Sequence, residues 1–283
     1  MPHSALRAIT RHYPITRGRS RATHALSRWF SIPVGTVVPF DRDLRIELCE
    51  DQFVSKQIYW FGIFEPVEAE IFKKSVKPGM TVVDIGANIG QYTLLAGKRV
   101  GDYGHVYAFE PSSRNHRIIE RNIRRNGFQK RVTLNKVAIT SGSTQGVLVI
   151  ADDGGSNWLA TGQRDGSRTI EEIQCDTVDS YLEDHHINKV DVIKIDAEGC
   201  DFEVLKGAVK TLERQSPLLF VEFAERLLKK FGTTSKDMLN FLTRLDFVPY
   251  AMTDNGLKVL RKDADISNTN LLLKRSAGKI SVF

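Results

Sequence analysis

The stretch "VVDIGANIGQYT" at residues 82–93 decides the fold. An apolar, β-branched run ends in the carboxylate of Asp84, Gly86 and Gly90 follow closely, and the chain then continues in a helical pattern. Glycines let a backbone turn sharply and approach a ligand, and a helix that begins there offers unpaired N–H groups. Because an acid at a phosphate cradle is unfavourable, the stretch predicts a loop that binds a ligand with a cationic amino group.

From residue 77 onward, apolar strands alternate with helical segments. The strands are expected at 80–86, 105–111, 131–139, 189–199 and 217–223, with closing strands at 247–253, 257–260 and 269–274. The helices between them are expected at 91–100, 112–127, 201–215 and 234–245, and 141–170 is expected to be an insertion of short strands and loops. This alternation predicts an α/β fold with a doubly wound, mostly parallel sheet and helices on both faces.

Carboxylates stand at or just past the ends of four expected strands: Asp84, Glu110, Asp196 and Glu222. In sheets of this kind, ligands bind beyond the carboxyl ends of the strands. A carboxylate at position 110 can accept both hydroxyls of a ribose. A ribose that carries an amino acid and no phosphate describes S-adenosylmethionine. A helix-capping role for Asp84 is the structural alternative.

Three stretches, "VVDIGANIGQYT", "YAFEP" and "VIKIDAEGCDFEVLKG", together resemble the FkbM-type methyltransferases, a family of class I S-adenosylmethionine-dependent enzymes. The resemblance covers about residues 60–273, including "GIFEPVEAEIFKKSVKPG" and "NLLL". It implies a seven-stranded class I sheet and methyl transfer to oxygen. Acceptors in the family are typically hydroxyls of sugars, glycolipids or secondary metabolites.

The resemblance also implies which residues hold the cofactor. The methionine and sugar part would lie against the loop from Asp84 to Gly90, and the ribose hydroxyls on Glu110. The adenosine pocket would be shaped by the residues after the second and third strands. The full expected set is Asp84, Gly86, Ala87, Asn88, Gly90, Glu110, Pro111, Ser112, Val137, Ala138 and Asp196.

Three carboxylates are candidates for the base that removes the acceptor's proton: Asp196, Glu198 and Glu222. On an extended segment, positions 196 and 198 share a face, and Lys194 has the same parity and can hold Asp196. An acid at a helix N-terminus is the alternative for Glu198. These carboxylates could bind Mg²⁺, but the sequence shows no clear metal-ligand set and no metal is assigned.

The segment "DDGGSNWLATGQRDGSR" at 152–168 departs from the family's shorter loop, and acceptor specificity is expected there. The side chains of Ser156 and Asn157 can bind acceptor hydroxyls. The ring of Trp158 can stack on a sugar or line an apolar pocket, although burial in the core is an equal alternative. The expected acceptor is a small, glycan or lipid-linked hydroxyl compound.

The net charge of +6 comes from the N-terminal segment. Residues 1–40 contain six arginines and no acid, so the remaining chain has 34 basic residues against 34 acidic ones. This balance disfavours a nucleic-acid-binding face. The segment is loosely similar to a mitochondrial presequence, but a basic arm or edge helix is preferred. No stretch approaches the roughly 20 apolar residues of a membrane span.

The expected organisation is a weakly structured basic arm at 1–35, a strand and helix extension at 36–76, and the methyltransferase domain at 77–275. The three cysteines are far apart and form no C-x-x-C pair, which indicates reduced thiols and a cytoplasmic protein.

Three other functions compete. A nicotinamide oxidoreductase is disfavoured because the middle glycine of G-x-G-x-x-G is missing and Asp84 precedes the loop. A nucleic-acid methyltransferase is disfavoured because no N/D-P-P-Y/F stretch is present. A cofactor-binding module without catalysis stays open, since a fold does not imply an activity.

Overall fold

The computed structural model describes residues 2–12, 18–150, 157–160, 169–261 and 264–276. An eight-stranded sheet lies at its centre. In chain order its strands are β3 (Thr81–Ile85), β4 (His105–Phe109), β5 (Val132–Asn135), β10 (Val192–Ile195), β11 (Leu218–Ala224), β12 (Phe247–Thr253), β13 (Gly256–Val259) and β14 (Asn268–Arg275). Their spatial order is β13-β12-β14-β11-β10-β3-β4-β5. The switch from β3–β4 to β10–β11 lies in the middle of the sheet, where a ligand site is expected.

The predicted doubly wound, mostly parallel sheet is confirmed. Strands β5, β4, β3, β10 and β11 are parallel, whereas β14, β12 and β13 run antiparallel to their neighbours. The sheet has one strand more than the seven expected because β13 returns as a hairpin along β12 at the sheet edge. The single strand expected at 131–139 is wrong. It divides after Asn135, and Val137–Ile139 forms β6 in a separate sheet.

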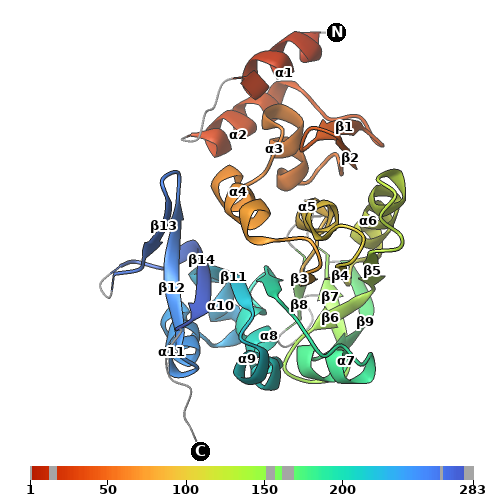
Figure 1. The fold of residues 1–283 in the computed structure, drawn as a ribbon. Coiled ribbons are helices and arrows are strands. Elements are labelled where there is room, and N and C mark those ends of the chain that lie inside the picture. The colour runs from red at the N-terminus through yellow and green to blue at the C-terminus, as the bar shows by residue number, and fades with distance from the viewer. Residues whose placement is uncertain (1, 13–17, 151–156, 161–168, 262–263, 277–283) are drawn as a thin grey trace, which may run out of the picture.

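Helices cover both faces of the sheet (Figure 1). One face carries α4 (Pro66–Ser75), α5 (Gln91–Val100) and α6 (Ser113–Arg125). The other carries α7 (Val178–Asp184), α8 (Asp201–Lys206), α9 (Val209–Gln215), α10 (Glu225–Leu228), the short 3₁₀ helix η1 (Lys229–Phe231) and α11 (Ser235–Arg244). Side chains alternate accordingly: on β10, Val192 packs toward α4–α6, while Ile193 and Ile195 pack toward α7–α11. None of the described helices has the length and apolar character needed to cross a bilayer.

A second, four-stranded sheet is formed by the insertion. It contains β6 (Val137–Ile139), β7 (Gln145–Val149), β8 (Trp158–Leu159) and β9 (Ile170–Asp176), in the order β6-β9-β7-β8. Its small core consists of Ala138, Leu148, Ile173 and Cys175. The sheet stands beside the carboxyl ends of the central strands, so it can wall a site there.

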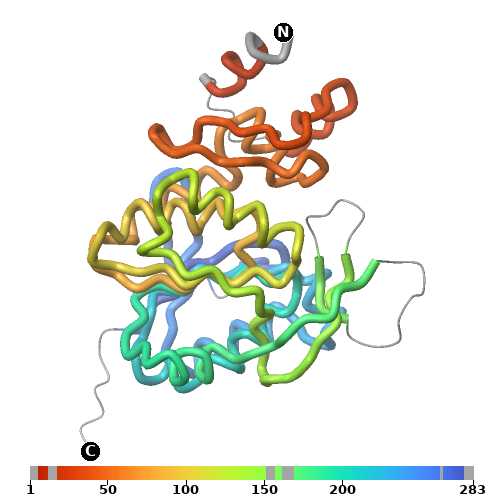
Figure 2. Tube along the Cα trace, turned by 90° about the vertical axis from the view of Figure 1, so that its right-hand side faces the viewer, coloured from red at the N-terminus to blue at the C-terminus, as the bar shows by residue number. Residues whose placement is uncertain are grey.

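The N-terminal segment forms a layer outside α4–α6, which Figures 1 and 2 show from two sides. It consists of α1 (Pro2–His12), α2 (Arg19–Trp29), a hairpin of β1 (Val37–Phe40) and β2 (Leu44–Glu47), and α3 (Phe53–Phe61). The expectation of a weakly structured arm at 1–35 is therefore wrong for the described residues, which form two helices.

The arginines of this segment have a structural role. Arg11 donates to the carbonyl of Ile58 at 3.2 Å, Arg7 donates to that of Tyr59 at 3.2 Å, and Thr10 donates to that of Trp60 at 2.5 Å. These are carbonyls of the last turn of α3, where a helix leaves acceptors over, although that of Ile58 also accepts the N–H of the C-cap residue Gly62 at 2.9 Å. Cations at this end also meet the negative pole of the helix dipole. The basic side chains thus attach α1 to the C-terminus of α3.

Candidate active site

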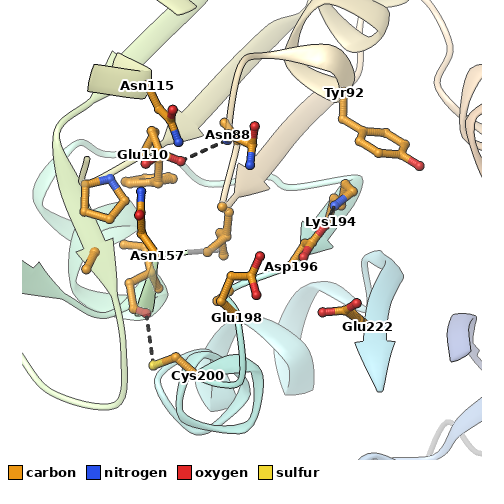
Figure 3. Close-up of a pocket in the computed structure, with 18 of the residues that line it drawn as sticks. Asn88, Tyr92, Glu110, Asn115, Asn157, Lys194, Asp196, Glu198, Cys200 and Glu222 are labelled. Carbon is orange, nitrogen blue, oxygen red and sulfur yellow. Dashed lines mark hydrogen bonds and ion pairs between the residues drawn. The ribbon is translucent and has the colours of Figure 1, made fainter. Parts of the chain in front are cut away.

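A cavity lies at the carboxyl ends of β3, β4, β10 and β11 and is walled on one side by the second sheet. Glu110, Asn88 and Asn115 gather at one end of it, and Lys194, Asp196, Glu198 and Glu222 at the other (Figure 3). Of the expected site residues, the cavity is lined by Gly86, Ala87, Asn88, Glu110, Pro111, Val137, Ala138, Asn157, Asp196, Glu198 and Glu222. The structure therefore brings together residues that are up to 136 positions apart in sequence, from Gly86 to Glu222 (222 − 86).

Four expected residues lie outside the cavity wall: Asp84, Gly90, Ser112 and Trp158. The ring of Trp158 instead packs beneath the ammonium of Lys230, 4.2 Å from the ring centroid. Ser156 lies outside the described residues. Of the residues expected to contact the acceptor from the segment 152–168, Asn157 lines the cavity. The apolar side chain of Leu159 lines it as well.

Gly86 is required by the protein's own backbone. Its φ is +78°, and a Cβ added there would lie 1.8 Å from the carbonyl oxygen of Asp196. The loop after β3 and the loop after β10 therefore touch at this residue, and only glycine permits the contact. The sequence predicts that the missing side chain makes room for a ligand. The structure shows that it makes room for the neighbouring loop.

Asp84 lies beneath the binding loop and is fully buried. Its Oδ2 accepts a hydrogen bond from the hydroxyl of Thr93 at 2.6 Å, and its Oδ1 has no hydrogen-bond partner. Burial raises the pKa of Asp84, and the Lys194 ammonium opposes that shift. Since β3 and β10 place Asp84 directly beside Lys194, Asp84 supports the loop from below, behind the cavity wall.

Glu110 is held by the backbone on either side of it. Its Oε2 accepts the N–H of Asn88 at 2.9 Å, and its Oε1 accepts the N–H of Ser112 at 3.0 Å. Burial raises the pKa of Glu110 to about 7, although these hydrogen bonds favour its charged form. Asn88 adopts a left-handed backbone, with φ of 56°, to direct its N–H at this carboxylate. Both carboxylate oxygens are therefore fixed at the cavity wall.

The helix α5 begins at the bottom of the same loop. Gly90 is its N-cap, with φ of 92°, and makes no side-chain hydrogen bond to the first turn. A Cβ there would lie 3.3 Å from Ile119 of α6, which explains the second glycine by close packing. The loop thus combines a helix N-terminus without a side-chain cap and a fixed carboxylate.

Lys194 and Asp196 form the ion pair that their parity predicted, with Nζ and Oδ2 2.9 Å apart. The Lys194 side chain is buried and lies 4.4 Å from the centroid of the Tyr92 ring. Burial alone would lower the pKa of Lys194, but the carboxylates of Asp196, Asp84 and Glu65 raise it above its usual value. Lys194 is therefore a permanent cation that orients Asp196.

Asp196 and Glu198 do not lie on an extended segment, so that expectation is wrong. β10 ends at Ile195, and the chain then turns through Glu198, with φ of 51°, and Gly199, with φ of 97°. Asp201 holds this turn by accepting the N–H groups of Ala197 at 2.8 Å and Gly199 at 3.0 Å. Both carboxylates nevertheless reach the cavity (Figure 3).

Glu222 lies on β11 and faces the same end of the cavity (Figure 3). Burial, together with the neighbouring charges of Asp196 and Asp201, raises the pKa of Glu222 to about 10. A carboxyl group with this pKa is protonated at neutral pH. It can donate a hydrogen bond, but it is a poor candidate for the general base.

Glu65 is a cavity residue to which the sequence analysis assigned no role. Its Oε2 accepts the hydroxyl of Tyr92 at 3.0 Å, and its Oε1 accepts the amide of Asn270 at 2.9 Å. Burial raises the pKa of Glu65, and the charge of Asp196 adds to this. The signal was present in "FEPVE", where an acid directly precedes the proline that opens α4, but a helix start explains that pattern equally well.

The central sheet, the cavity at its switch point and the fixed Glu110 define a class I S-adenosylmethionine-dependent methyltransferase. The family model described as "Methyltransferase FkbM domain" matches residues 84–249. The chain therefore belongs to the FkbM methyltransferase family, as its motifs indicated, and S-adenosylmethionine is its cofactor.

Solved structures with a related fold include a methyltransferase FkbM from Methylobacillus flagellatus KT. It is 16% identical, with a TM-score of 0.45, and the match covers 92% of this chain and 59% of that chain. An O-methyltransferase from Bacillus cereus in complex with SAH is 14% identical, with a TM-score of 0.45 and coverage of 75% and 82%. A putative rRNA-methylase from Clostridium thermocellum is 16% identical, with a TM-score of 0.44 and coverage of 75% and 95%.

The residues present fit the cofactor. Glu110 offers two oriented carboxylate oxygens to ribose hydroxyls, and the loop from Gly86 to Gly90 leads into an α5 N-terminus without a side-chain cap. Val137, Ala138 and Ile139 provide an apolar wall on which a base can lie. Across the cavity, the acids around Lys194 can meet a positively charged methyl donor.

Proposed function

We propose that the protein transfers the methyl group of S-adenosylmethionine to a hydroxyl oxygen of a sugar, glycolipid or secondary-metabolite acceptor. The observation that carries this proposal is the Lys194–Asp196 ion pair, which holds a carboxylate at the edge of the cavity opposite the ribose-binding end. A fixed carboxylate near the methyl donor is what an alcohol requires, because an alcohol is a poor nucleophile until its proton leaves.

Each residue has a distinct part in this proposal. Glu110 would bind the ribose hydroxyls, residues 86–89 would surround the methionine portion, and Pro111, Val137 and Ala138 would line the adenosine pocket. The cofactor supplies the activated methyl group. Asp196 would accept the proton of the acceptor's hydroxyl as that oxygen takes the methyl group, and the cofactor would leave as S-adenosylhomocysteine. Glu198 borders the same space.

The charge of the cavity supports a neutral hydroxyl acceptor over a nucleic acid. Glu65, Asp196 and Glu198 all line it, and a phosphate backbone is bound by Lys and Arg. The arginines nearest the N-terminus are engaged with α3 rather than offered to a ligand. Asn157 of the second sheet supplies an amide on the acceptor's side.

A cytoplasmic setting is part of the proposal. Cys49, Cys175 and Cys200 are all buried and form no disulfide. Three reduced thiols suit a reducing compartment.

The test is calorimetric binding of S-adenosylhomocysteine to the purified protein, with NADH measured beside it and Glu110→Ala as the variant. We expect micromolar binding of S-adenosylhomocysteine that Glu110→Ala abolishes. A panel of hydroxyl compounds is then screened with labelled S-adenosylmethionine for methyl transfer. Preference for NADH would instead support the dinucleotide alternative, and cofactor binding without methyl transfer to any hydroxyl would support a module without catalysis.

A further inference from the structure

A small side pocket, with room for about one water-sized group, opens from the catalytic end of the cavity. It lies between α4, β11 and β14, on the α4–α6 face of the sheet. Five residues border both spaces: Glu65, Tyr92, Lys194, Asp196 and Glu222. Because Asp196, the proposed base, borders both spaces, a group bound in the side pocket lies beside it.

Glu65 is fixed in this pocket from several directions. It is the N-cap of α4 and has a left-handed backbone, with φ of 48°, which is uncommon for a residue other than glycine. The side-chain amide of Gln91 forms two hydrogen bonds with the backbone of the preceding residue, Phe64. The Phe64 N–H donates to the Gln91 oxygen at 2.9 Å, and the Gln91 nitrogen donates to the Phe64 carbonyl at 3.0 Å. Such strain at a cavity wall, held by surrounding contacts, is typical of a functional position.

Glu222 borders the side pocket from β11. It is the register partner of Asn270 across the antiparallel pair β11–β14, so both side chains lie on one face of the sheet. Asn270 also donates a hydrogen bond to Glu65. Glu65, Asn270 and Glu222 therefore lie next to one another in the wall of the pocket. Among the described residues, nothing forms a hydrogen bond with the Glu222 carboxyl group. Burial raises the pKa of Glu222, so its protonated carboxyl group can donate a hydrogen bond to a bound ligand.

We propose, on the basis of the O-methyl transfer above, that this side pocket receives one hydroxyl of an acceptor held in the main cavity, and that it thereby selects a vicinal diol. One hydroxyl faces Asp196 and is methylated, and its neighbour lies between Glu65 and Glu222. A hydroxyl group both donates and accepts, and the carboxyl groups of Glu65 and Glu222 both border the pocket as hydrogen-bonding partners for it. An ammonium group is a poorer match because Lys194 already supplies the positive charge. An apolar group would leave the carboxyl group of Glu222 unpaired.

The probes are methyl α-D-glucopyranoside, methyl α-D-galactopyranoside, methyl α-D-mannopyranoside and their monodeoxy analogues. Binding is measured by saturation-transfer NMR with S-adenosylhomocysteine present, and methyl transfer is measured with labelled S-adenosylmethionine. We expect at least one glycoside to bind and be methylated. The analogue that lacks the hydroxyl next to the methylated one should bind at least about tenfold more weakly, because a site built for a hydroxyl rejects its absence.

The variants are Glu65→Gln and Glu222→Leu, with Glu70→Gln as the matched control on the outer side of α4. Both pocket variants should weaken glycoside binding about tenfold or more and leave the affinity for S-adenosylhomocysteine unchanged, which also shows that they fold. Asn270→Ala, which frees Glu65 without removing it, should have a smaller effect in the same direction. The control should match the wild type.

The outcomes separate the two proposals. If the wild type binds no S-adenosylhomocysteine, the methyltransferase assignment of this cavity fails and the side pocket proposal fails with it. If the cofactor product binds but no glycoside binds, the vicinal-diol pocket is overturned alone. It is equally overturned if glycosides are methylated while monodeoxy analogues and pocket variants behave like their parents.

Discussion

The two ends of the cavity are built differently. At the cofactor end, Glu110 and Asn88 belong to two short motifs and are tied to each other by backbone N–H groups. At the proposed acceptor end, the wall is drawn from five separate elements, and side-chain hydrogen bonds join Glu65 to Tyr92 and to Asn270. The other residues there are Lys194 and Glu222. A short local motif is enough to position a cofactor, which is the same for every acceptor. A pocket wall assembled from distant segments can be changed by substituting one residue at a time.

This difference predicts where substitutions do the most damage. Changes in the cofactor loop should affect folding and binding together, because its glycines are required by the neighbouring backbone. Changes at the acceptor end should alter rate or acceptor affinity and leave the cofactor in place. Changes in the N-terminal layer should affect stability alone.

The largest effect is expected from Gly86→Ala. The added Cβ would overlap the carbonyl oxygen of Asp196 at 1.8 Å, and the loops must separate. We expect a loss of about 3 kcal/mol or more in the free energy of unfolding, measured in urea, and no binding of S-adenosylhomocysteine. The matched control is Gly79→Ala, where φ is +81° but no atom lies within 4 Å. It should cost about 1 kcal/mol and spare binding. Equal losses for the two variants would show that strain, and not loop contact, governs this site.

Asp196→Asn should separate the two ends of the cavity most clearly. Loss of a positioned base lowers the rate of methyl transfer by about 10²–10⁴-fold. The affinity for S-adenosylhomocysteine should change little, because the ribose end is untouched. The rate is measured with labelled methyl donor, and Asp184→Asn on the exposed end of α7 serves as the control. A rate within a few-fold of the wild type would exclude Asp196 as the base and direct attention to Glu198.

Cofactor binding should depend on pH through Glu110. Its pKa of about 7 means that the carboxylate form, which accepts ribose hydroxyls, is lost as pH falls. The group is about nine-tenths ionised at pH 8 and about one-tenth at pH 6, so the Kd of S-adenosylhomocysteine should be about tenfold higher at pH 6. Calorimetry across this range measures it. In Glu110→Gln the binding should be weaker throughout and the slope should disappear. A slope that persists in that variant would assign it to another group.

The smallest effect is expected from Arg11→Ala. The variant removes a donor from the carbonyl of Ile58 and a cation from the negative end of α3. We expect a loss of about 1 kcal/mol in the free energy of unfolding, with unchanged binding of S-adenosylhomocysteine. Arg28→Ala on the exposed face of α2 is the control and should have no effect. A defect in cofactor binding would mean that the N-terminal layer positions the site and does more than cover α4–α6.

Much of the central sheet could be predicted because its strands are buried on both faces and appear as continuous apolar runs. The break after Asn135 could not, since one apolar run, "RVTLNKVAI", serves two sheets and nothing in its spacing marks the change. The helices at 2–12 and 19–29 were missed for a related reason. Arg7 and Arg11 of the first helix donate to carbonyls of α3 that lie about 50 residues away in sequence. Arg19 of the second helix donates to the carbonyl of Ile63, 44 residues away.

By itself, the sequence determined the class of fold, the cofactor and the Lys194–Asp196 pair, because these depend on alternation, short motifs and strand parity. Only the tertiary structure decided that the missing side chain of Gly86 leaves room for a neighbouring loop, that Asp84 lies behind the cavity wall, and that Glu65 lines the cavity. Burial decided the protonation of Glu222 in the same way. Contact distance and desolvation depend on what surrounds a residue in space, and for these residues the surroundings come from segments far away along the chain.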